Sequence, residues 1–252
     1  MTSSKPTKVG SFHSQEKERK MAIKHDSVRE VVSLKTTQDN FCGTKSFEKV
    51  AINRGYLCQT LDLEPEHQPD IIGNILFTDP GSCWFAHFSP PCTGFSVASI
   101  GTHWGGGYRK YEPKTETAKL GIKILNRVAE LIAKHKYQYW TVENPMGVFR
   151  KVFPEILKRH GILDFKMVTV TYCQYGDTRM KPTDIFTNIP NWQGKRCKNG
   201  SPCHEPAPRG SKTGTQGLKN AKLRGVIPPK LFHEIFDCIE KLEDNKNAQT
   251  KG

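Results

Sequence analysis

Short runs of apolar residues alternate along the chain with longer segments in which apolar residues recur at helical spacing. Six runs predict strands, because they are short, rich in β-branched and aromatic residues and bounded by turn residues; they span 56–63, 70–76, 83–89, 137–144, 165–173 and 184–189. Residues 46–53, closed by Gly55, and residues 114–136 predict helices. This alternation predicts an α/β fold with a mostly parallel sheet and helices on both faces, whose ligands bind at the carboxyl ends of the strands.

The less regular segments set the expected domain limits. Residues 1–26 and 243–252 are polar and predict disordered tails, the first of them basic. Between them we expect a main domain over 27–190, a small loop-rich insertion over 191–218 and a helix over 219–242 that completes the main domain. The first strand has two interpretations. Either residues 28–34 form it and it ends early, or it is a short, poorly hydrophobic strand directly before Phe41.

Charge and cysteine content narrow the class of protein. The 252 residues carry a formal net charge of +13, which favours a polyanionic partner such as nucleic acid, although lysines that serve only solubility are an alternative. The eight scattered cysteines are typical of free thiols in a reducing compartment. Because no run of about 18 apolar residues and no signal peptide is apparent, we expect an intracellular protein without a membrane partner.

Three strand ends carry candidate chemistry. Pro90-Pro91 leads to Cys92 directly after an apolar run, and two prolines make a stiff mount for a nucleophile; a turn that happens to contain a thiol is the alternative. Glu143 also follows an apolar run and precedes Asn-Pro. A basic cluster follows the strand over 165–173 and could bind phosphates or a base carbonyl; it comprises Gln174, Arg179 and Lys181. Taken singly, the glutamate and the basic cluster could equally be solvated surface.

Together these segments resemble the DNA (cytosine-5)-methyltransferase family. SPPCTGFS (89–96) is similar to its nucleophile motif, TVENP (141–145) to its glutamate motif, and YGDTRMKPTDIFTN (175–188) stands where its arginine motif belongs. FCGTKSF (41–47) and TLDLEP (60–65) are similar to its cofactor-binding motifs. GVIPPKLFHEI (225–235) is similar to the closing segment of its short, phage-type branch. The resemblance runs from about Phe41 to Glu240.

The resemblance implies a Rossmann-like S-adenosylmethionine-dependent methyltransferase fold, in which 27–190 is the catalytic domain and 191–218 a target-recognition insertion. It implies that Cys92 adds to C6 of a flipped-out cytosine, that Glu143 contacts the N3 edge, and that Arg179 holds the O2 carbonyl. Double-stranded DNA is the implied partner, bound by a monomer. Residues 93–114 would form a mobile loop over the base, and the expected DNA contacts are Ser96, Arg109, Lys110, Lys181, Arg209 and Lys212.

The implied cofactor is S-adenosyl-L-methionine. Phe41 would pack on its adenine, Gly43 would let the backbone approach, and Asp62 would bind the ribose diol. The full set of expected cofactor contacts is Phe41, Gly43, Thr44, Asp62, Leu63, Asn74, Ile75 and Pro90. Two positions depart from the commoner family pattern. Lys45 replaces a glycine of the cofactor turn, and Asn74 stands where an acidic residue is usual.

The sequence also allows a metal site and other functions as alternatives. Cys197, Cys203 and His204 hint at zinc, but their spacing lacks a CxxC pair and no fourth ligand is evident, so no metal is expected. A catalytically silent nucleic-acid-binding relative and an RNA cytosine-5 methyltransferase are alternatives to the DNA enzyme. Attack on a free pyrimidine nucleotide, as in thymidylate synthase, would leave the Glu143 segment without a role.

Overall fold

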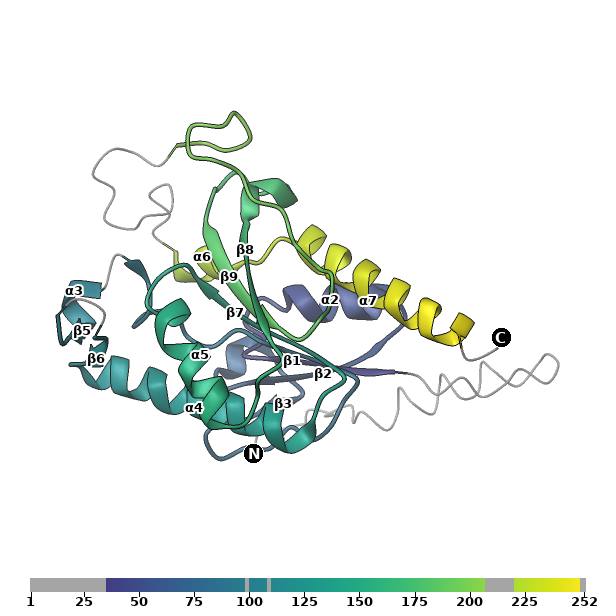
Figure 1. Cartoon of the computed structure of the whole chain (residues 1–252), viewed down its shortest axis with the longest axis horizontal. Helices are drawn as coiled ribbons and strands as arrows, with labels where there is room; N and C mark the ends of the chain where they lie inside the picture. Colours follow the sequence, from purple (N-terminus) through teal and green to yellow (C-terminus); the bar gives the residue numbers. More distant parts are fainter. Residues whose placement is uncertain (1–34, 98–99, 108–109, 207–219, 250–252) are drawn as a thin grey trace, which may run out of the picture. The chain divides into compact units, whose positions relative to one another are not determined.

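The computed structural model describes residues 35–97, 100–107, 110–206 and 220–249. The predicted tail over 1–26 and the possible strand over 28–34 lie outside these ranges. The described chain forms a seven-stranded sheet in the order β3-β2-β1-β4-β7-β9-β8 (Figure 1). Its strands are β1 Thr36–Asn40, β2 Leu57–Asp62, β3 Ile71–Ile72, β4 Phe85–Phe88, β7 Tyr139–Pro145, β8 Lys166–Thr171 and β9 Pro182–Thr187.

The sheet is parallel except for β9, which lies antiparallel between β7 and β8. Six strands that run in one direction, with β9 inserted antiparallel next to the edge strand β8, confirm the predicted Rossmann-like α/β fold with a mostly parallel sheet. No helix among the described residues is long and apolar enough to cross a membrane.

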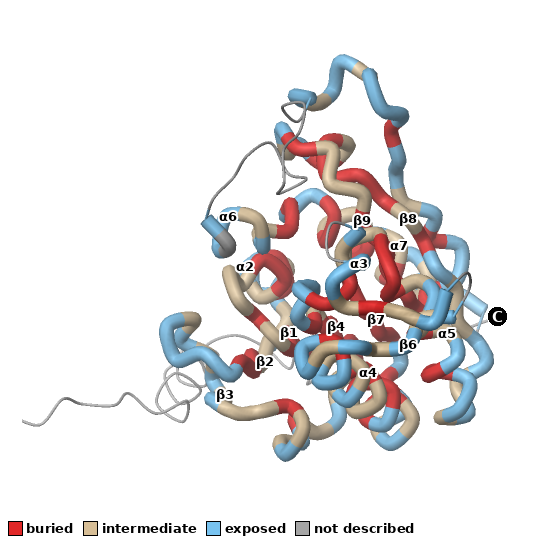
Figure 2. Tube along the Cα trace, turned by 90° about the vertical axis from the view of Figure 1, so that its left-hand side faces the viewer, coloured by how far each residue is buried: buried red, intermediate tan, exposed pale blue. Residues whose placement is uncertain are grey.

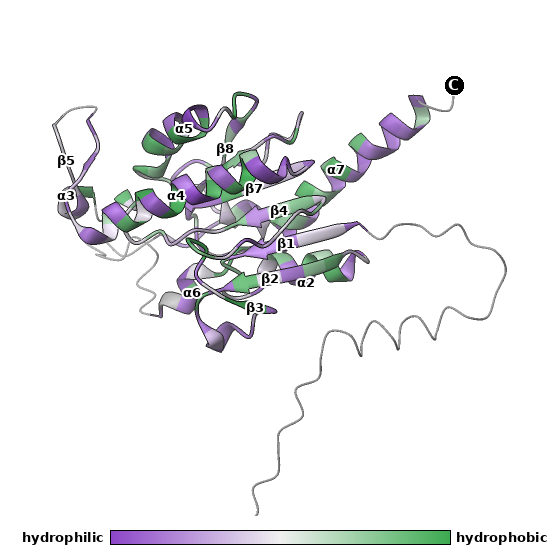
Figure 3. Ribbon diagram, turned by 90° about the horizontal axis from the view of Figure 1, so that it is seen from below, coloured by the Kyte–Doolittle hydropathy of each residue, from purple (hydrophilic) through white to green (hydrophobic). Residues whose placement is uncertain are grey.

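Helices cover both faces of the sheet. Figure 3 shows α4 and α5 on one side of it and α2 on the other. One apolar cluster joins the sheet to α4 and α5, and a second joins it to α2 and α7. Figure 2 shows the buried positions gathered along the strands and the helix faces that meet them. These helices are α2 Ser46–Asn53, α4 Glu116–His135, α5 Phe149–Arg159 and α7 Pro229–Gln249, with short helices α3 Ile100–His103 and α6 Ala221–Gly225.

Strand β1 is polar in sequence and yet central in the sheet. Of its five residues, Thr37, Gln38, Asp39 and Asn40 are all buried. The Gln38 amide donates to the carbonyl of Pro80 at 2.8 Å, and the Asn40 amide donates to the carbonyl of His87 at 3.3 Å. Because side chains of this kind can be buried when they find such partners, hydrophobicity alone could not identify the strand. A short, poorly hydrophobic first strand before Phe41 is the interpretation that the structure supports.

Three further elements differ from the sequence-based expectations. Strand β3 covers only Ile71–Ile72 of the run predicted over 70–76, because the chain turns at Asn74. Helix α5 was not predicted. Helix α7 continues to Gln249, so the described part of the expected tail over 243–252 is helical. Glu243 explains the extension, since its carboxylate accepts hydrogen bonds from Lys35 at 2.8 Å and Tyr139 at 2.7 Å.

The topology brings the candidate motifs to one edge of the sheet. β1, β2, β4 and β7 are parallel, so the segments that follow them emerge at the same edge. β8 ends and β9 begins at this edge too, because Thr171 pairs with Pro182. The edge therefore carries the cofactor-like turn, the Pro-Pro-Cys segment, the Glu-Asn-Pro segment and the basic segment.

Candidate active site

A cavity of about 910 Å³ opens at this edge. The ends of β1, β2, β4 and β7 form its walls, and α6 adds a rim from the other end of the sequence. Cys92, Glu143 and Lys181 line one part of it, while Phe41 and Asp62 line another. A single continuous hollow thus holds both the candidate reactive groups and the candidate cofactor residues.

Cys92 is held by hydrogen bonds on both sides of its peptide unit. The buried Asn144 side chain donates to the carbonyl of Pro90 at 2.8 Å, which ties the Pro-Pro segment to the end of β7. The Cys92 carbonyl accepts from the backbone N–H of Phe95 at 2.9 Å and of Ser96 at 3.3 Å. Cys92 lines the cavity and is exposed as a residue. The structure therefore supports the interpretation of the prolines as a rigid mount.

Three neighbouring groups tune the Cys92 thiol in opposite directions. Loss of solvation raises its pKa most, and the carboxylate of Glu143 raises it further. The positive charges of Lys181 and Arg224 lower the pKa in part. The balance leaves the pKa of the thiol above its ordinary value. Because the charge of Lys181 lowers that pKa, it increases the fraction of Cys92 present as thiolate.

Glu143 is almost fully buried, with 6% of its surface exposed. Its Oε1 accepts a hydrogen bond from the Tyr172 hydroxyl at 2.7 Å. Burial raises the pKa of the carboxyl, and the charge of Lys181 and the Tyr172 hydrogen bond oppose that rise. A carboxyl in this setting keeps its proton at a higher pH than a surface glutamate, which suits a proton donor.

The structure does not bring Arg179 to the cavity, which contradicts the placement expected for it. Its guanidinium is 5% exposed and forms an ion pair with Asp177. The terminal nitrogens of the guanidinium also donate to three backbone carbonyls at 3.1–3.2 Å, those of Leu223, Arg224 and Val226. Arg179 therefore fixes the α6 segment and does not line the cavity.

Lys181, two residues after Arg179, is the basic residue of this segment that lines the cavity. Its Nζ donates to the carbonyl of Arg224 at 2.9 Å and lies 4.6 Å from the centre of the Tyr172 ring. Burial lowers the pKa of Lys181, while Glu143 and Cys92 raise it. No local pattern predicts this difference, because residues two apart in an extended segment face the same side, whereas Lys181 departs from extended geometry with φ 24°.

The cofactor-like end is built around the β1–α2 turn. Phe41 has a left-handed backbone with φ 63°, and Gly43 has φ 46°. The Gly43 N–H donates to Asp62 Oδ2 at 2.9 Å, and His67 Nδ1 lies 3.1 Å from the same oxygen. The turn is thus tied by Gly43 to a carboxylate at the end of β2.

Asp39 is a cavity residue that sequence analysis missed. It lies in β1, lines the cavity and is 2% exposed. Burial raises its pKa to about 8, although a hydrogen bond from the Glu48 N–H opposes the shift. The sequence does contain a signal for it. If TTQDN is assigned as a strand, its acidic residue Asp39 lies two positions before Phe41, near the end of that strand.

The remaining expected cofactor residues fall into two groups. Thr44, Leu63, Ile75 and Pro90 line the cavity as expected. Asn74 lines it too, but its Oδ1 already accepts the Leu76 N–H at 3.0 Å, which makes it part of a turn. Lys45 does not line the cavity. It precedes α2 with φ 57°, and its Nζ pairs with Glu48 at 3.4 Å.

The expected DNA contacts are only partly brought together. Ser96 lines the cavity, whereas Lys110 is exposed and does not. Arg109, Arg209 and Lys212 lie outside the described residues. Two basic residues of α6, Lys222 and Arg224, line the cavity and were not predicted. Their signal was a basic pair just before the GVIPP segment.

The segment over 93–114 is more structured than a simple loop. Its described residues include α3 and a hairpin of β5 Trp104–Gly105 with β6 Glu112–Pro113. Trp104 is buried, and its indole N–H donates to the carbonyl of Gly94 at 2.5 Å. This anchor packs the segment next to the Pro-Pro-Cys turn.

The sequence makes no fourth metal ligand evident, and the structure supplies a candidate for it. Cys173, at the end of β8, lies with Cys197, Cys203 and His204 in one cluster. None of the four lines the cavity. The sequence could not show this, because Cys173 is 24 positions from Cys197 and the fold alone brings them together.

No protein-family model matches the chain. The chain is 28% identical over 216 residues to the probable DNA (cytosine-5)-methyltransferase of Frog virus 3 (isolate Goorha), a match that covers 79% of this chain and 97% of the relative. The resemblance indicated by the motifs is thereby confirmed over most of the chain.

Solved structures are less similar. The S. pombe Dnmt2 methyltransferase has 10% identity and a TM-score of 0.44, over 64% of this chain and 53% of that one. A SAM-dependent methyltransferase from Archaeoglobus fulgidus has 9% identity and a TM-score of 0.39, over 71% and 94% of the two chains. The chain spans about half the length of the S. pombe protein.

Proposed function

We propose that the chain is a DNA cytosine-5 methyltransferase that attacks a flipped-out cytosine through Cys92. The observation that supports this most is the convergence of Cys92, Glu143 and Lys181 in one cavity with Asp62 and Phe41. A thiol, a buried acid and a cation are the groups that addition to an electron-poor pyrimidine ring requires.

Cys92 acts as the nucleophile. Its thiolate sulfur bonds to C6 of cytosine, the C5–C6 double bond opens, and C5 becomes nucleophilic. After C5 has gained a methyl group, it loses its proton and the C6–sulfur bond breaks, which restores the ring and the thiolate. The rigid mount from Pro90 and Asn144 holds the sulfur in one position, where small displacements cost rate steeply.

Glu143 and Lys181 stabilise the charge that this addition places on the ring. Glu143 in its acid form donates a proton to N3, and its raised pKa keeps that form available. Lys181 takes the role that the resemblance implied for Arg179: it lies beside Cys92 and Glu143 and offers an N–H donor to the O2 carbonyl.

The other end of the cavity fits S-adenosyl-L-methionine, which supplies an electrophilic methyl group when bound. Asp62 at the end of β2 is placed to accept hydrogen bonds from the ribose diol. Phe41 and Ile75 offer apolar walls for a ring. Asp39 provides a buried carboxyl for a cationic group, since a nearby positive charge would favour its ionised form. Lys45 does not obstruct the site, because its charge is paired with Glu48.

DNA would enter over α6 and the segment that begins at Ser96. Lys222 and Arg224 are positioned to contact phosphates beside the cavity, which is consistent with the net charge of +13. Because C5 is inaccessible in a stacked duplex, the base must leave the helix to reach Cys92. In this proposal residues 191–218 are the insertion that recognises the target DNA sequence.

Trapping of the covalent adduct tests the proposal. Duplex DNA that contains 5-fluorocytosine is incubated with the chain and S-adenosylmethionine, and denatured samples are weighed by mass spectrometry. Fluorine at C5 cannot leave as the proton does, so the wild type should accumulate a protein–DNA adduct. Cys92→Ala should form none, whereas the matched control Cys238→Ala should form as much as wild type.

The outcomes separate the alternatives. An adduct with 5-fluorocytosine RNA but not with DNA would favour the RNA enzyme. Binding of DNA without any adduct would favour the catalytically silent relative. An adduct in the Cys92→Ala variant would show that another thiol is the nucleophile.

A further inference from the structure

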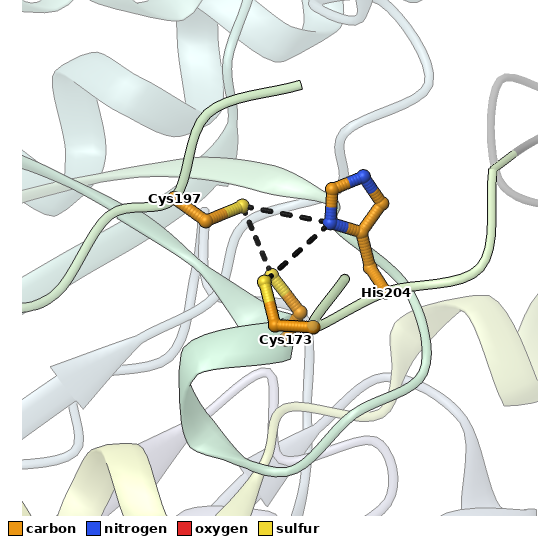
Figure 4. Close-up of side chains that lie close together, drawn as sticks. Cys173, Cys197 and His204 are labelled. Atoms are coloured by element: carbon orange, nitrogen blue, oxygen red, sulfur yellow. Dashed lines mark hydrogen bonds between the residues drawn. The ribbon is translucent and has the colours of Figure 1, made fainter. Parts of the chain in front are cut away.

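Three cysteines and one histidine converge outside the candidate active site. Their ligand atoms, the sulfurs of Cys173, Cys197 and Cys203 and one ring nitrogen of His204, all lie within 4.8 Å of one another. Cys173 belongs to the 3-10 helix η3 Tyr172–Tyr175, while the other three come from the segment after β9. Figure 4 shows Cys197 and His204 facing Cys173 across a common centre.

The spacing of these atoms matches a metal tetrahedron and not a disulfide. Cys173 Sγ lies 3.2 Å from Cys197 Sγ and 3.7 Å from Cys203 Sγ. His204 Nδ1 lies 3.7 Å from Cys197 Sγ and 3.6 Å from Cys203 Sγ. With Zn–S bonds of about 2.3 Å, a tetrahedral ion separates its sulfurs by about 3.8 Å, whereas a disulfide needs about 2.0 Å.

The surrounding groups hold the ligands in place. The Cys197 N–H donates to Thr171 Oγ1 at 2.8 Å, and the Gln174 amide donates to Cys203 Sγ at 3.2 Å. The Thr171 N–H donates to the carbonyl of Lys195 at 3.1 Å. Hydrogen bonds of this kind orient ligands and stabilise negative sulfur in metal sites.

The segment that supplies three of the ligands has few other means of holding its conformation. Residues 195–206 contain no helix or strand. Three of these twelve residues are Lys or Arg and two are Pro, and Cys197 is the buried hydrophobic side chain among them. Short segments without a core of their own are commonly held by a metal or a disulfide.

We propose that Cys173, Cys197, Cys203 and His204 bind one Zn²⁺ in a closed structural site. Three thiolates and one imidazole form a Cys₃His set, which favours zinc over hard cations. Because all four positions are taken by protein ligands, the ion has a structural role and no open position for catalysis.

The site would attach the 195–206 segment to the wall of the cavity. Cys173 is adjacent to Tyr172, whose hydroxyl binds Glu143. On the other side of the cluster, the Glu205 N–H donates to the carbonyl of Thr178 at 2.9 Å. Zinc would thus connect the segment to η3, and the proposal stands independently of the proposed reaction.

Metal analysis of the full-length chain, purified without an affinity tag, tests the proposal. Inductively coupled plasma mass spectrometry should find about one zinc per chain. Cys197→Ser and His204→Ala should each lower zinc affinity, measured by chelator competition, by at least about 100-fold, more than the loss of an outer partner costs. The matched control Cys238→Ser should keep wild-type affinity.

Two measurements on the wild type need no variant. Replacement of zinc by Co²⁺ should give the intense visible absorption of a tetrahedral thiolate site, and chelation should speed proteolysis within 195–206. A wild-type chain that binds neither metal in equimolar amount would overturn the proposal. Fewer than the eight free thiols of the sequence, counted on the denatured, metal-free and unreduced chain, would instead show a disulfide and overturn it too.

Discussion

Lys181 and Glu143 act on the Cys92 thiol with opposite signs. The cation lowers the pKa of the thiol and the carboxylate raises it. The motif suggests Arg179 as the cation of the site, but Arg179 instead forms an ion pair with Asp177 and donates to carbonyls of the α6 segment. The chemistry of the site therefore depends on which of these two basic residues, Arg179 or Lys181, faces the cavity.

Opposite shifts in Cys92 reactivity should follow from two substitutions. Lys181→Met removes the positive charge and should move the alkylation of Cys92 to higher pH. Glu143→Gln removes the negative charge and should move it to lower pH. Iodoacetamide labelling of Cys92 across a pH series, quantified by mass spectrometry, measures both midpoints. Lys110→Met, an exposed cation outside the cavity, is the control and should leave the midpoint unchanged; shifts of the same sign in both variants would contradict this account.

The buried carboxyl of Asp39 makes stability depend on pH. Its folded pKa of about 8 lies above the ordinary value of 3.8 for an aspartate, so between these values the folded state binds a proton that the unfolded state has lost. The free energy of unfolding should therefore fall as pH rises from 5 to 8, by at most about 1.4 kcal/mol per pH unit from this group. Asp39→Asn has no such proton to lose, and its stability relative to wild type should increase over that range. Urea unfolding at several pH values measures the difference; a constant difference would show that Asp39 is ionised throughout.

At the scale of elements, the sequence predicted those helices and strands that have a clear apolar periodicity or stand next to a motif. Helices α2 and α4 and the strands that carry Cys92 and Glu143 lie where apolar patterns placed them. The apolar pattern did not identify strand β1, because its buried side chains are polar and donate hydrogen bonds to backbone carbonyls of distant segments. The sequence also did not predict that Lys181 faces the cavity or that Cys173 lies beside Cys197. Both features depend on tertiary contacts, which no local sequence pattern records.

Close packing between two of these elements depends on Gly147. It bridges to Ser96, and a Cβ atom added there would lie 2.0 Å from the carbonyl oxygen of Phe95. The Val148 N–H also donates to that carbonyl at 2.8 Å. The turn after Cys92 and the turn after Glu143 are thus joined backbone to backbone, which leaves no room for a side chain.

Gly147→Ala should separate these turns. Because the clash is with backbone, we expect a loss of about 1–3 kcal/mol in stability, the range for overpacked sites. We also expect slower formation of the 5-fluorocytosine adduct, since the mount of Cys92 must shift. Thermal unfolding and adduct kinetics measure the two effects. Gly101→Ala, where an added Cβ meets nothing within 4 Å, is the matched control; equal behaviour of the two variants would show that the junction adapts without cost.

At the scale of the molecule, the cavity combines parts from across the chain. Its walls come from strand ends that the sheet topology aligns, and its basic rim comes from α6, near the end of the sequence. Arg179 links the two, because it binds the carbonyls of Leu223 and Val226. Helix α7 follows this rim and packs beside α2, so the closing segment both completes the core and delivers Lys222 and Arg224 to the cavity.

The charge of that rim should appear in the salt dependence of DNA binding. Each phosphate contact contributes about 0.9 to the slope of log affinity against log salt concentration, through release of counterions. If Lys222 and Arg224 each contact a phosphate, their double substitution by alanine should reduce the slope by about 1.8. Fluorescence anisotropy with a labelled duplex over a KCl series measures it. Lys158→Ala in α5, an exposed residue paired with Glu155 and absent from the cavity lining, should leave the slope unchanged. An unaltered slope in the double variant would mean that DNA approaches the cavity from another side.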